Sequence, residues 1–70
     1  MQDYLTIFIN GEPFHCDSHM SLANVLLYLG INRDNIVVEY NHQIISKNDF
    51  NNLSFKQNDS LEIITIVGGG

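Results

Sequence analysis

The sequence has 70 residues, of which 44% are hydrophobic and 16% are charged, and this length and composition indicate one small globular domain. A net charge of −5, with three basic residues in all, argues against binding to nucleic acid or to an anionic membrane surface. The single cysteine, Cys16, excludes an intrachain disulfide and fits a reducing compartment. No apolar stretch approaches the length of a spanning helix, and the first residues lack the basic start of a signal peptide.

The chain begins with a predicted β-hairpin. Residues 4–9 are mostly β-branched or aromatic, which favours a strand. Asn10 and Gly11 follow, and both tolerate the positive φ of a tight hairpin turn. Residues 12–16 then form the return strand, which Pro13 places at an edge of the sheet.

A single helix is predicted after the hairpin. Its buried stripe repeats at i, i+3, i+4 and i+7 through Leu22, Val25, Leu26 and Leu29. Ser21 is a good N-cap for this helix, and Gly30 suits the left-handed position that ends it.

The rest of the chain predicts three more strands, at residues 36–40, 43–45 and 61–67. Turns around 41–42 and 58–59 bound them, and residues 47–55 form an irregular or 3₁₀ segment attached to the core. The element order is ββαβββ, an α+β class with one helix packed on one face of a four- to five-stranded sheet.

The last strand indicates a surface for a partner. Leu61 and Ile63 are expected to face the helix, so Ile64 and Ile66 point to the open side of the sheet. Phe8 joins them if the first strand lies alongside. An apolar patch of this kind often marks an interaction surface, but two or three exposed apolar side chains are also normal in soluble proteins, and both interpretations stay open here.

No group of residues in the sequence predicts catalysis or metal binding. The segment from His15 to His19 holds one thiol and two imidazoles, but neighbours on a strand point to opposite faces and no second cluster completes a four-ligand site. The acidic residues are scattered, and no phosphate-binding glycine loop is present. The pattern favours a carrier or an adaptor over an enzyme.

The chain closes on three glycines, Gly68, Gly69 and Gly70. Glycine has no Cβ, so this segment offers a slim strip of backbone that reaches roughly 10 Å and carries a carboxylate. We therefore expect a domain over residues 1–66 and a flexible tail over 67–70 that can enter another protein's active site. A frayed terminus is the alternative interpretation.

Several motifs recur in an order that is typical of one family. They are Ile9-Asn10-Gly11-Glu12, Ser21-Leu22, Leu26-Leu27, Leu29-Gly30, Val37-Val38-Glu39-Tyr40-Asn41, Ile44-Ile45, Asp59, Leu61-Glu62-Ile63 and Val67-Gly68-Gly69-Gly70. Together they resemble the sulfur carrier proteins of thiamine biosynthesis, the ThiS family, over residues 5–70. The resemblance implies the ubiquitin-like β-grasp fold with a mixed sheet. The chain departs from the family at Asn58, Ser46-Lys47 and Phe50, where the family has Gly, Pro-Arg and Trp.

The resemblance also implies a chemical role for the C-terminus. The Gly70 carboxylate would be adenylated with ATP by an activating enzyme related to those of ubiquitin, and sulfur from a cysteine desulfurase route would displace AMP. The resulting thiocarboxylate would supply sulfur to thiazole synthase. Gly68 and Gly69 would thread the partner's active site, and Phe8, Ile64 and Ile66 are the candidate docking face. The chain itself would hold no metal and no permanent cofactor, because ATP and the catalytic groups belong to the partners.

Two alternatives to a sulfur carrier of thiamine biosynthesis remain. One is a carrier like the small subunit of molybdopterin synthase, which shares the fold and the Gly-Gly end, although the short length and the Val-Gly-Gly-Gly ending favour thiamine. The other is a β-grasp interaction module whose tail is inert. Nine Asn and nine Ile beside two Lys indicate an AT-rich genome, bacterial or organellar, so the expected location is the cytoplasm or, for an organelle-encoded chain, the plastid stroma.

Overall fold

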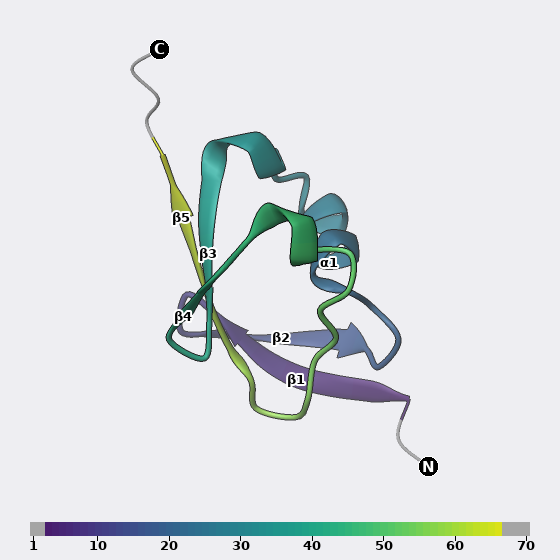
Figure 1. Cartoon of the computed structure of the whole chain (residues 1–70). Coiled ribbons are helices and arrows are strands. Elements are labelled where there is room, and N and C mark those ends of the chain that lie inside the picture. The colour runs from purple at the N-terminus through teal and green to yellow at the C-terminus, as the bar shows by residue number, and fades with distance from the viewer. Residues whose placement is uncertain (1–2, 67–70) are drawn as a thin grey trace.

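The computed structural model describes residues 3–66, which form one sheet and one α-helix (Figure 1). The elements are β1 (Tyr4–Ile9), β2 (Glu12–Asp17), α1 (Leu22–Leu29), η1 (Arg33–Asn35), β3 (Ile36–Tyr40), β4 (Gln43–Ile45), η2 (Lys47–Asp49) and β5 (Ser60–Thr65), where η marks a 3₁₀ helix. The predicted ββαβββ order is confirmed. No helix among these residues is long and apolar enough to cross a membrane.

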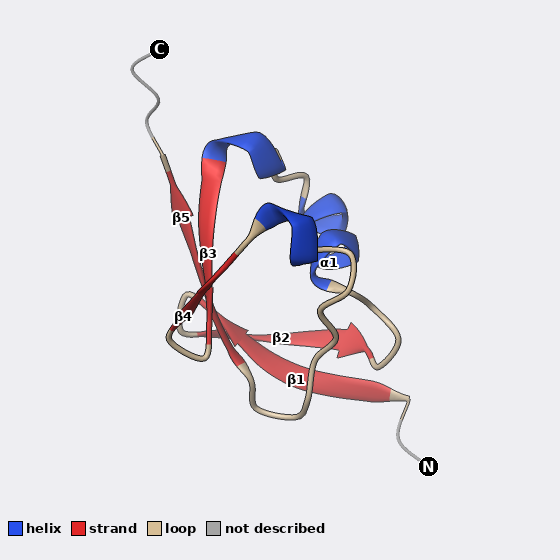
Figure 2. Cartoon of the chain, viewed as in Figure 1, coloured by secondary structure: helices blue, strands red, loops and turns tan. Residues whose placement is uncertain are grey.

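The five strands pair in the order β2-β1-β5-β3-β4. β1 and β5 are parallel, and the other three pairs are antiparallel, so the sheet is mixed. Figure 2 shows α1 lying across one side of this sheet. β2 is an edge strand, as Pro13 predicts, and β5 lies in the middle between β1 and β3. β5, the last strand of the described chain, therefore pairs with a neighbouring strand on each side.

Both hairpins use two-residue turns with positive φ. Asn10 and Gly11 have φ of 51° and 84°, and Asn41 and His42 have φ of 48° and 73°. This geometry matches the right-handed twist of the flanking strands. The two predicted turns are confirmed.

The helix begins and ends where its capping residues predict. The Ser21 hydroxyl accepts a hydrogen bond from the Asn24 N–H at 3.2 Å, and the Asn24 side chain accepts from the Ser21 N–H at 3.0 Å. Gly30, with φ of 72°, ends the helix and donates its N–H to the carbonyls of Leu26 and Leu27. These bonds satisfy backbone groups that a helix end leaves without partners.

The segment between η2 and β5 closes onto the start of α1. The N–H groups of Leu22 and Ala23 donate to the carbonyls of Leu53 and Phe50, both at 2.9 Å. The Phe50 side chain is 1% exposed. The prediction of an irregular segment attached to the core is confirmed, and the backbone of that segment completes the helix N-terminus.

The core lies between α1 and the sheet. Its buried side chains are Ile7, Cys16, Leu22, Val25, Leu26, Ile36, Val38, Phe50, Phe55 and Leu61. Removing each large apolar side chain from water contributes about 1.5–3 kcal/mol. Cys16 belongs to this group with 1% exposure, so the single thiol is a packing residue.

The last strand differs from its prediction at both ends. β5 starts at Ser60, one residue earlier than expected, because Ser60 pairs with Phe8 and donates its N–H to the Asn41 side chain at 2.8 Å. It ends at Thr65, although the Ile66 N–H still donates to the Asn35 carbonyl at 2.7 Å. The predicted end at residue 67 lies outside the described residues.

Candidate functional site

The predicted sulfur-loading end of the chain lies outside the described residues. Gly68, Gly69 and Gly70, and the boundary between residues 66 and 67, therefore stay predictions. The structure places the point from which this segment continues. β5 is a central strand, and the hydrogen bond from the Ile66 N–H to Asn35 keeps the chain on the β3 side.

The two faces predicted for the last strand agree with the observed burial. Leu61 is fully buried, and Ile63 packs against the core. Ile64 and Ile66 are 46% and 47% exposed on the opposite side. The assignment of these two residues to a docking face remains a prediction.

Phe8 shares that side of the sheet but lies away from the two isoleucines. The parallel register pairs Phe8 with Ser60, so Phe8 is level with the start of β5. Ile64 comes four residues later along the strand. At about 3.3 Å per residue, the separation is roughly 13 Å. The three predicted docking residues therefore do not form one continuous apolar patch.

The residues that do surround Ile64 and Ile66 were not singled out by the sequence. Strand pairing places Val37 beside Ile64, Glu39 beside Glu62, and Ile44 beside Glu39, all on the side of the sheet away from α1. Ile44 is 73% exposed. We call this surface the open face, and its members are Val37, Glu39, Ile44, Glu62, Ile64 and Ile66. The alternation of residues 36–40 was the available signal, since every second residue of that strand had to face away from the core.

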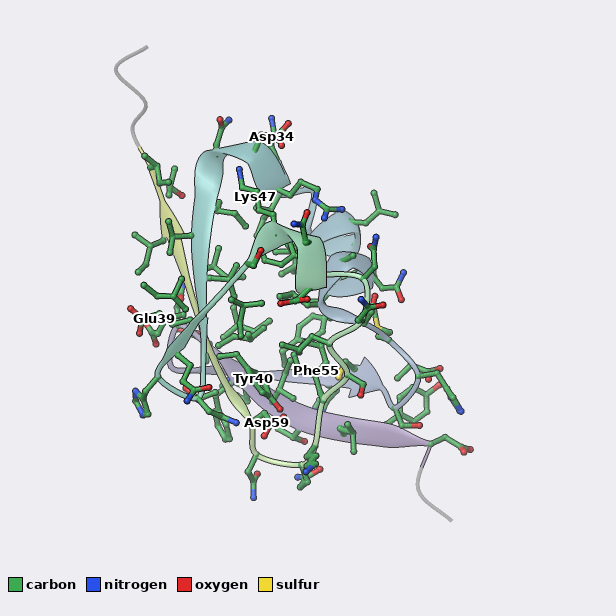
Figure 3. All side chains as sticks on the ribbon, viewed as in Figure 1. Asp34, Glu39, Tyr40, Lys47, Phe55 and Asp59 are labelled. Carbon is green, nitrogen blue, oxygen red and sulfur yellow. The ribbon has the colours of Figure 1, made fainter. Side chains whose placement is uncertain are left out.

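A polar cluster lies on the core side of the same strands (Figure 3). The Asp59 carboxylate accepts hydrogen bonds from the Tyr40 hydroxyl, from the Lys56 N–H at 2.7 Å and from the Asn41 side chain at 3.2 Å. Desolvation by burial, together with the Asp59 carboxylate, raises the pKa of Tyr40 to about 12. The carboxylate is 8% exposed, and its hydrogen bonds join the turn before β5 to β3 and the β3–β4 turn.

The histidine and cysteine segment does not form a reactive group. His15 and Cys16 point to opposite faces of β2, as the sequence predicts, and the His15 ring contacts the Thr6 hydroxyl at 3.0 Å. Burial raises the pKa of the Cys16 thiol, which disfavours the nucleophilic thiolate. Within residues 3–66, no three His, Cys, Asp or Glu side chains converge as metal ligands.

A shallow depression beside α1 offers no catalytic arrangement either. Its volume is about 280 Å³, and its lining residues are Ala23, Asn24, Leu26, Leu27, Ile31, Arg33 and Asn51. The charged member, Arg33, donates to the Lys47 carbonyl at 3.0 Å and lies over the Phe50 ring at 5.2 Å. The guanidinium is thus used to join η1 to the core.

A mixed sheet in the order β2-β1-β5-β3-β4, crossed by one helix, defines the ubiquitin-like β-grasp class of small proteins. The crystal structure of the thiamine biosynthesis protein ThiS from Geobacter metallireducens has this fold. It matches with a TM-score of 0.78 over 94% of this chain and 100% of that one, at 23% sequence identity. The model of the ThiS family matches residues 7–70. The chain belongs to the ThiS family of ubiquitin-like sulfur carriers, and the resemblance found in the sequence is confirmed.

Relatives of similar length occur in algae. The protein ycf40 of the red alga Porphyra purpurea is 42% identical over 66 residues, which are 94% of this chain and 93% of that protein. The ycf40 protein of the diatom Trieres chinensis is 38% identical over 65 residues, 93% of this chain and 89% of that protein. A thiazole synthase of Magnetococcus marinus is 27% identical over 66 residues, which are 94% of this chain but 20% of that protein.

Proposed function

We propose that this sulfur carrier serves thiazole formation in thiamine biosynthesis and is loaded at the Gly70 carboxylate. The observation that carries the proposal is that the family match runs through Gly68 and Gly69 to Gly70 itself. The described residues support it indirectly, because residues 3–66 present a buried thiol and no metal-ligand cluster. The chain is then a protein substrate, and the enzymes are its partners.

The chemistry follows from the weakness of a carboxylate as an electrophile. An activating enzyme related to those of ubiquitin would transfer AMP from ATP to Gly70 and release pyrophosphate. The outer sulfur of a persulfide from a cysteine desulfurase route would then displace AMP and form an acyl disulfide. A thiol would reduce this disulfide, becoming oxidised to a disulfide itself, and leave a thiocarboxylate on Gly70. Gly68 and Gly69 lack a Cβ, so they can pass a channel that any other residue would block.

Thiazole synthase is the proposed acceptor of the sulfur. Two relatives named thiazole synthase carry a segment similar to nearly all of this chain, and it makes up 20% of each protein. A carrier and the enzyme that it serves gain effective concentration when they share one polypeptide. This arrangement in the relatives favours thiazole synthase over molybdopterin synthase as the partner.

The proposed location is the plastid stroma. Matching ycf40 proteins of nearly equal length come from red algae and a diatom, and names of this kind are typical of plastid genomes. The activating enzyme and the sulfur donor would then have to work in the same compartment.

Intact mass spectrometry tests the proposal. The chain is incubated with the activating enzyme, ATP, a cysteine desulfurase with cysteine and a thiol reductant, and the expected product has one oxygen replaced by sulfur at Gly70. A matched variant with one alanine added after Gly70 keeps the domain and should not be loaded. An unchanged mass for the wild-type chain in the complete mixture would identify an inert interaction module instead.

A further inference from the structure

β5 ends at a hydrogen bond to η1. Ile36, the first residue of β3, pairs with Thr65, so the antiparallel register places Asn35 opposite Ile66. The Ile66 N–H donates to the Asn35 carbonyl at 2.7 Å, but the Asn35 N–H donates to the Asn32 carbonyl at 3.1 Å. A hydrogen-bonded antiparallel pair normally exchanges two such bonds. Asn35 therefore ends the ladder, because its carbonyl binds the sheet while its N–H belongs to η1.

The 3₁₀ conformation of η1 keeps β3 from starting earlier. In the same register, Asp34 and Arg33 would come opposite residues 67 and 68. Both lie in η1 instead, and the Asp34 N–H donates to the Asn32 side chain at 2.9 Å. Two more paired residues would fix roughly 7 Å of chain against the sheet. η1 thus sets Ile66 as the last described residue that binds on the β3 side.

Two cationic side chains hold η1 in place. The Arg33 guanidinium donates to the Lys47 carbonyl at 3.0 Å and lies 5.2 Å from the centre of the buried Phe50 ring. The Lys47 ammonium in turn donates to the Asp34 carbonyl at 3.2 Å, and Figure 3 shows these two residues close together. A single 3₁₀ turn has little stability of its own. We call Arg33 and Lys47, with the contacts that they make, the η1–η2 clasp.

We propose that the η1–η2 clasp positions the reactive end of the chain, because it holds Asn35 where the Asn35 carbonyl binds the Ile66 N–H. The inference rests on the proposed function, in which Gly70 must reach the active site of the activating enzyme. A short segment that starts from a fixed point loses fewer conformations on entering a site than one that starts from a loose strand end. Arg33 and Lys47 are therefore positioning residues, which act through η1 and take no part in the chemistry.

The alternative is a clasp that only stabilises the domain. Its removal would then loosen both sides of β5 together. The Ile63 N–H gives an internal reference, since it donates at 2.7 Å to the Asn10 side chain on the β1 side of the strand. A positioning role requires that the Ile66 amide responds more than the Ile63 amide.

Hydrogen exchange of the isolated protein tests the anchor. The clasp variants are Lys47→Met and Arg33→Met. In each, we expect the exchange rate of the Ile66 amide to rise about 3- to 10-fold more than that of the Ile63 amide, the effect of about one lost hydrogen bond. Lys56→Met is the matched control, because it also removes one positive charge and keeps the hydrogen-bonded N–H of that residue. Equal changes at the two amides in the clasp variants would overturn the proposal.

A second pair of variants removes the hydrogen bond directly. Ile66→Pro deletes the N–H, and Ile66→Val keeps it with a side chain of similar size. ATP–pyrophosphate exchange by the activating enzyme, measured against carrier concentration, should show kcat about 3- to 10-fold lower for the proline variant than for the valine variant. KM should differ less than about 2-fold, because the docked domain is the same and only the fraction of complexes with a well-placed carboxylate falls. Lys47→Met should lower kcat in the same way.

The outcomes separate this inference from the proposed function. If the wild-type chain gains sulfur and the two Ile66 variants have equal kcat, the positioning role is wrong and the proposed function stands. A raised KM with unchanged kcat would assign the hydrogen bond to docking and would also overturn the positioning role. If the wild-type chain gains no sulfur although the clasp variants release the Ile66 amide selectively, the proposed function and the positioning role fail together, and the clasp is a structural anchor alone.

Discussion

Asp59 joins the turn before β5 to β3 and to the β3–β4 turn. Its carboxylate accepts from the Tyr40 hydroxyl, the Asn41 amide and the Lys56 N–H while it is 8% exposed. No buried side-chain polar atom among residues 3–66 lacks a partner, so this cluster is fully satisfied. Asn58, with φ of 70°, supports the same turn where the ThiS family has glycine. The substitution keeps the turn because asparagine tolerates the left-handed region.

The Tyr40 hydroxyl should make folding sensitive to alkaline pH. Its pKa is raised from the ordinary 10.0 to about 12, so the unfolded chain loses the phenol proton first as the pH rises. The contribution of Tyr40 to stability is therefore complete below pH 10 and is lost between pH 10 and about 12. We expect Tyr40→Phe to cost about 1–3 kcal/mol at neutral pH and to flatten this alkaline loss, as measured by urea unfolding. The same alkaline slope in both proteins would assign the loss to other groups.

At the scale of elements, a side chain continues the sheet where β1 ends. The Asn10 side chain accepts from the Ile63 N–H at 2.7 Å and donates to the Ile63 carbonyl at 3.3 Å. The Asn10 side chain therefore makes the two hydrogen bonds to β5 that the backbone of one more β1 residue would make. The same residue forms the hairpin turn, so one asparagine fixes both neighbours of β1.

Asn10→Gly separates these two roles. Glycine keeps the positive φ of the turn but removes the amide, so we expect a loss of about 1–2 kcal/mol. Hydrogen exchange should show the Ile63 amide losing more protection than the Ile66 amide, which is bound to Asn35 on the other side of β5. An equal loss at both amides would indicate general destabilisation and would contradict the pairing role.

The elements were predictable from the sequence because their signals are local. Asn10-Gly11 defines a turn, and Ser21 and Gly30 define helix ends, through their own backbone and side-chain chemistry. The strand register is not local, since Phe8 pairs with Ser60 across the length of the domain. The distance of Phe8 from Ile64 depends on the register of β1 and β5, and the pairing of Glu39 with Glu62 depends on the register of β3 and β5. The sequence therefore predicted that Ile64 and Ile66 lie on the open face. It did not predict that Glu39 and Glu62 lie opposite each other on the same face.

At the scale of the whole molecule, the fold and the proposed reaction use different parts of the chain. The buried core of the described residues runs from Ile7 to Leu61. Gly70 lies beyond it in sequence, and the open face lies on the other side of the sheet from α1. Stability and loading should therefore respond to different substitutions.

A pair of variants tests this separation. Deleting Gly70 should leave the free energy of unfolding unchanged, because no core residue is altered, and should abolish the gain of sulfur, because the reacting carboxylate moves. Ile7→Val, at a fully buried position, should cost about 0.5–1.5 kcal/mol and leave loading intact under conditions where the protein is folded. Urea unfolding and intact mass measured on the same samples give both quantities. If the deletion lowers stability by as much as Ile7→Val, the end of the chain contributes to the packed domain, and the proposed division between domain and tail is wrong.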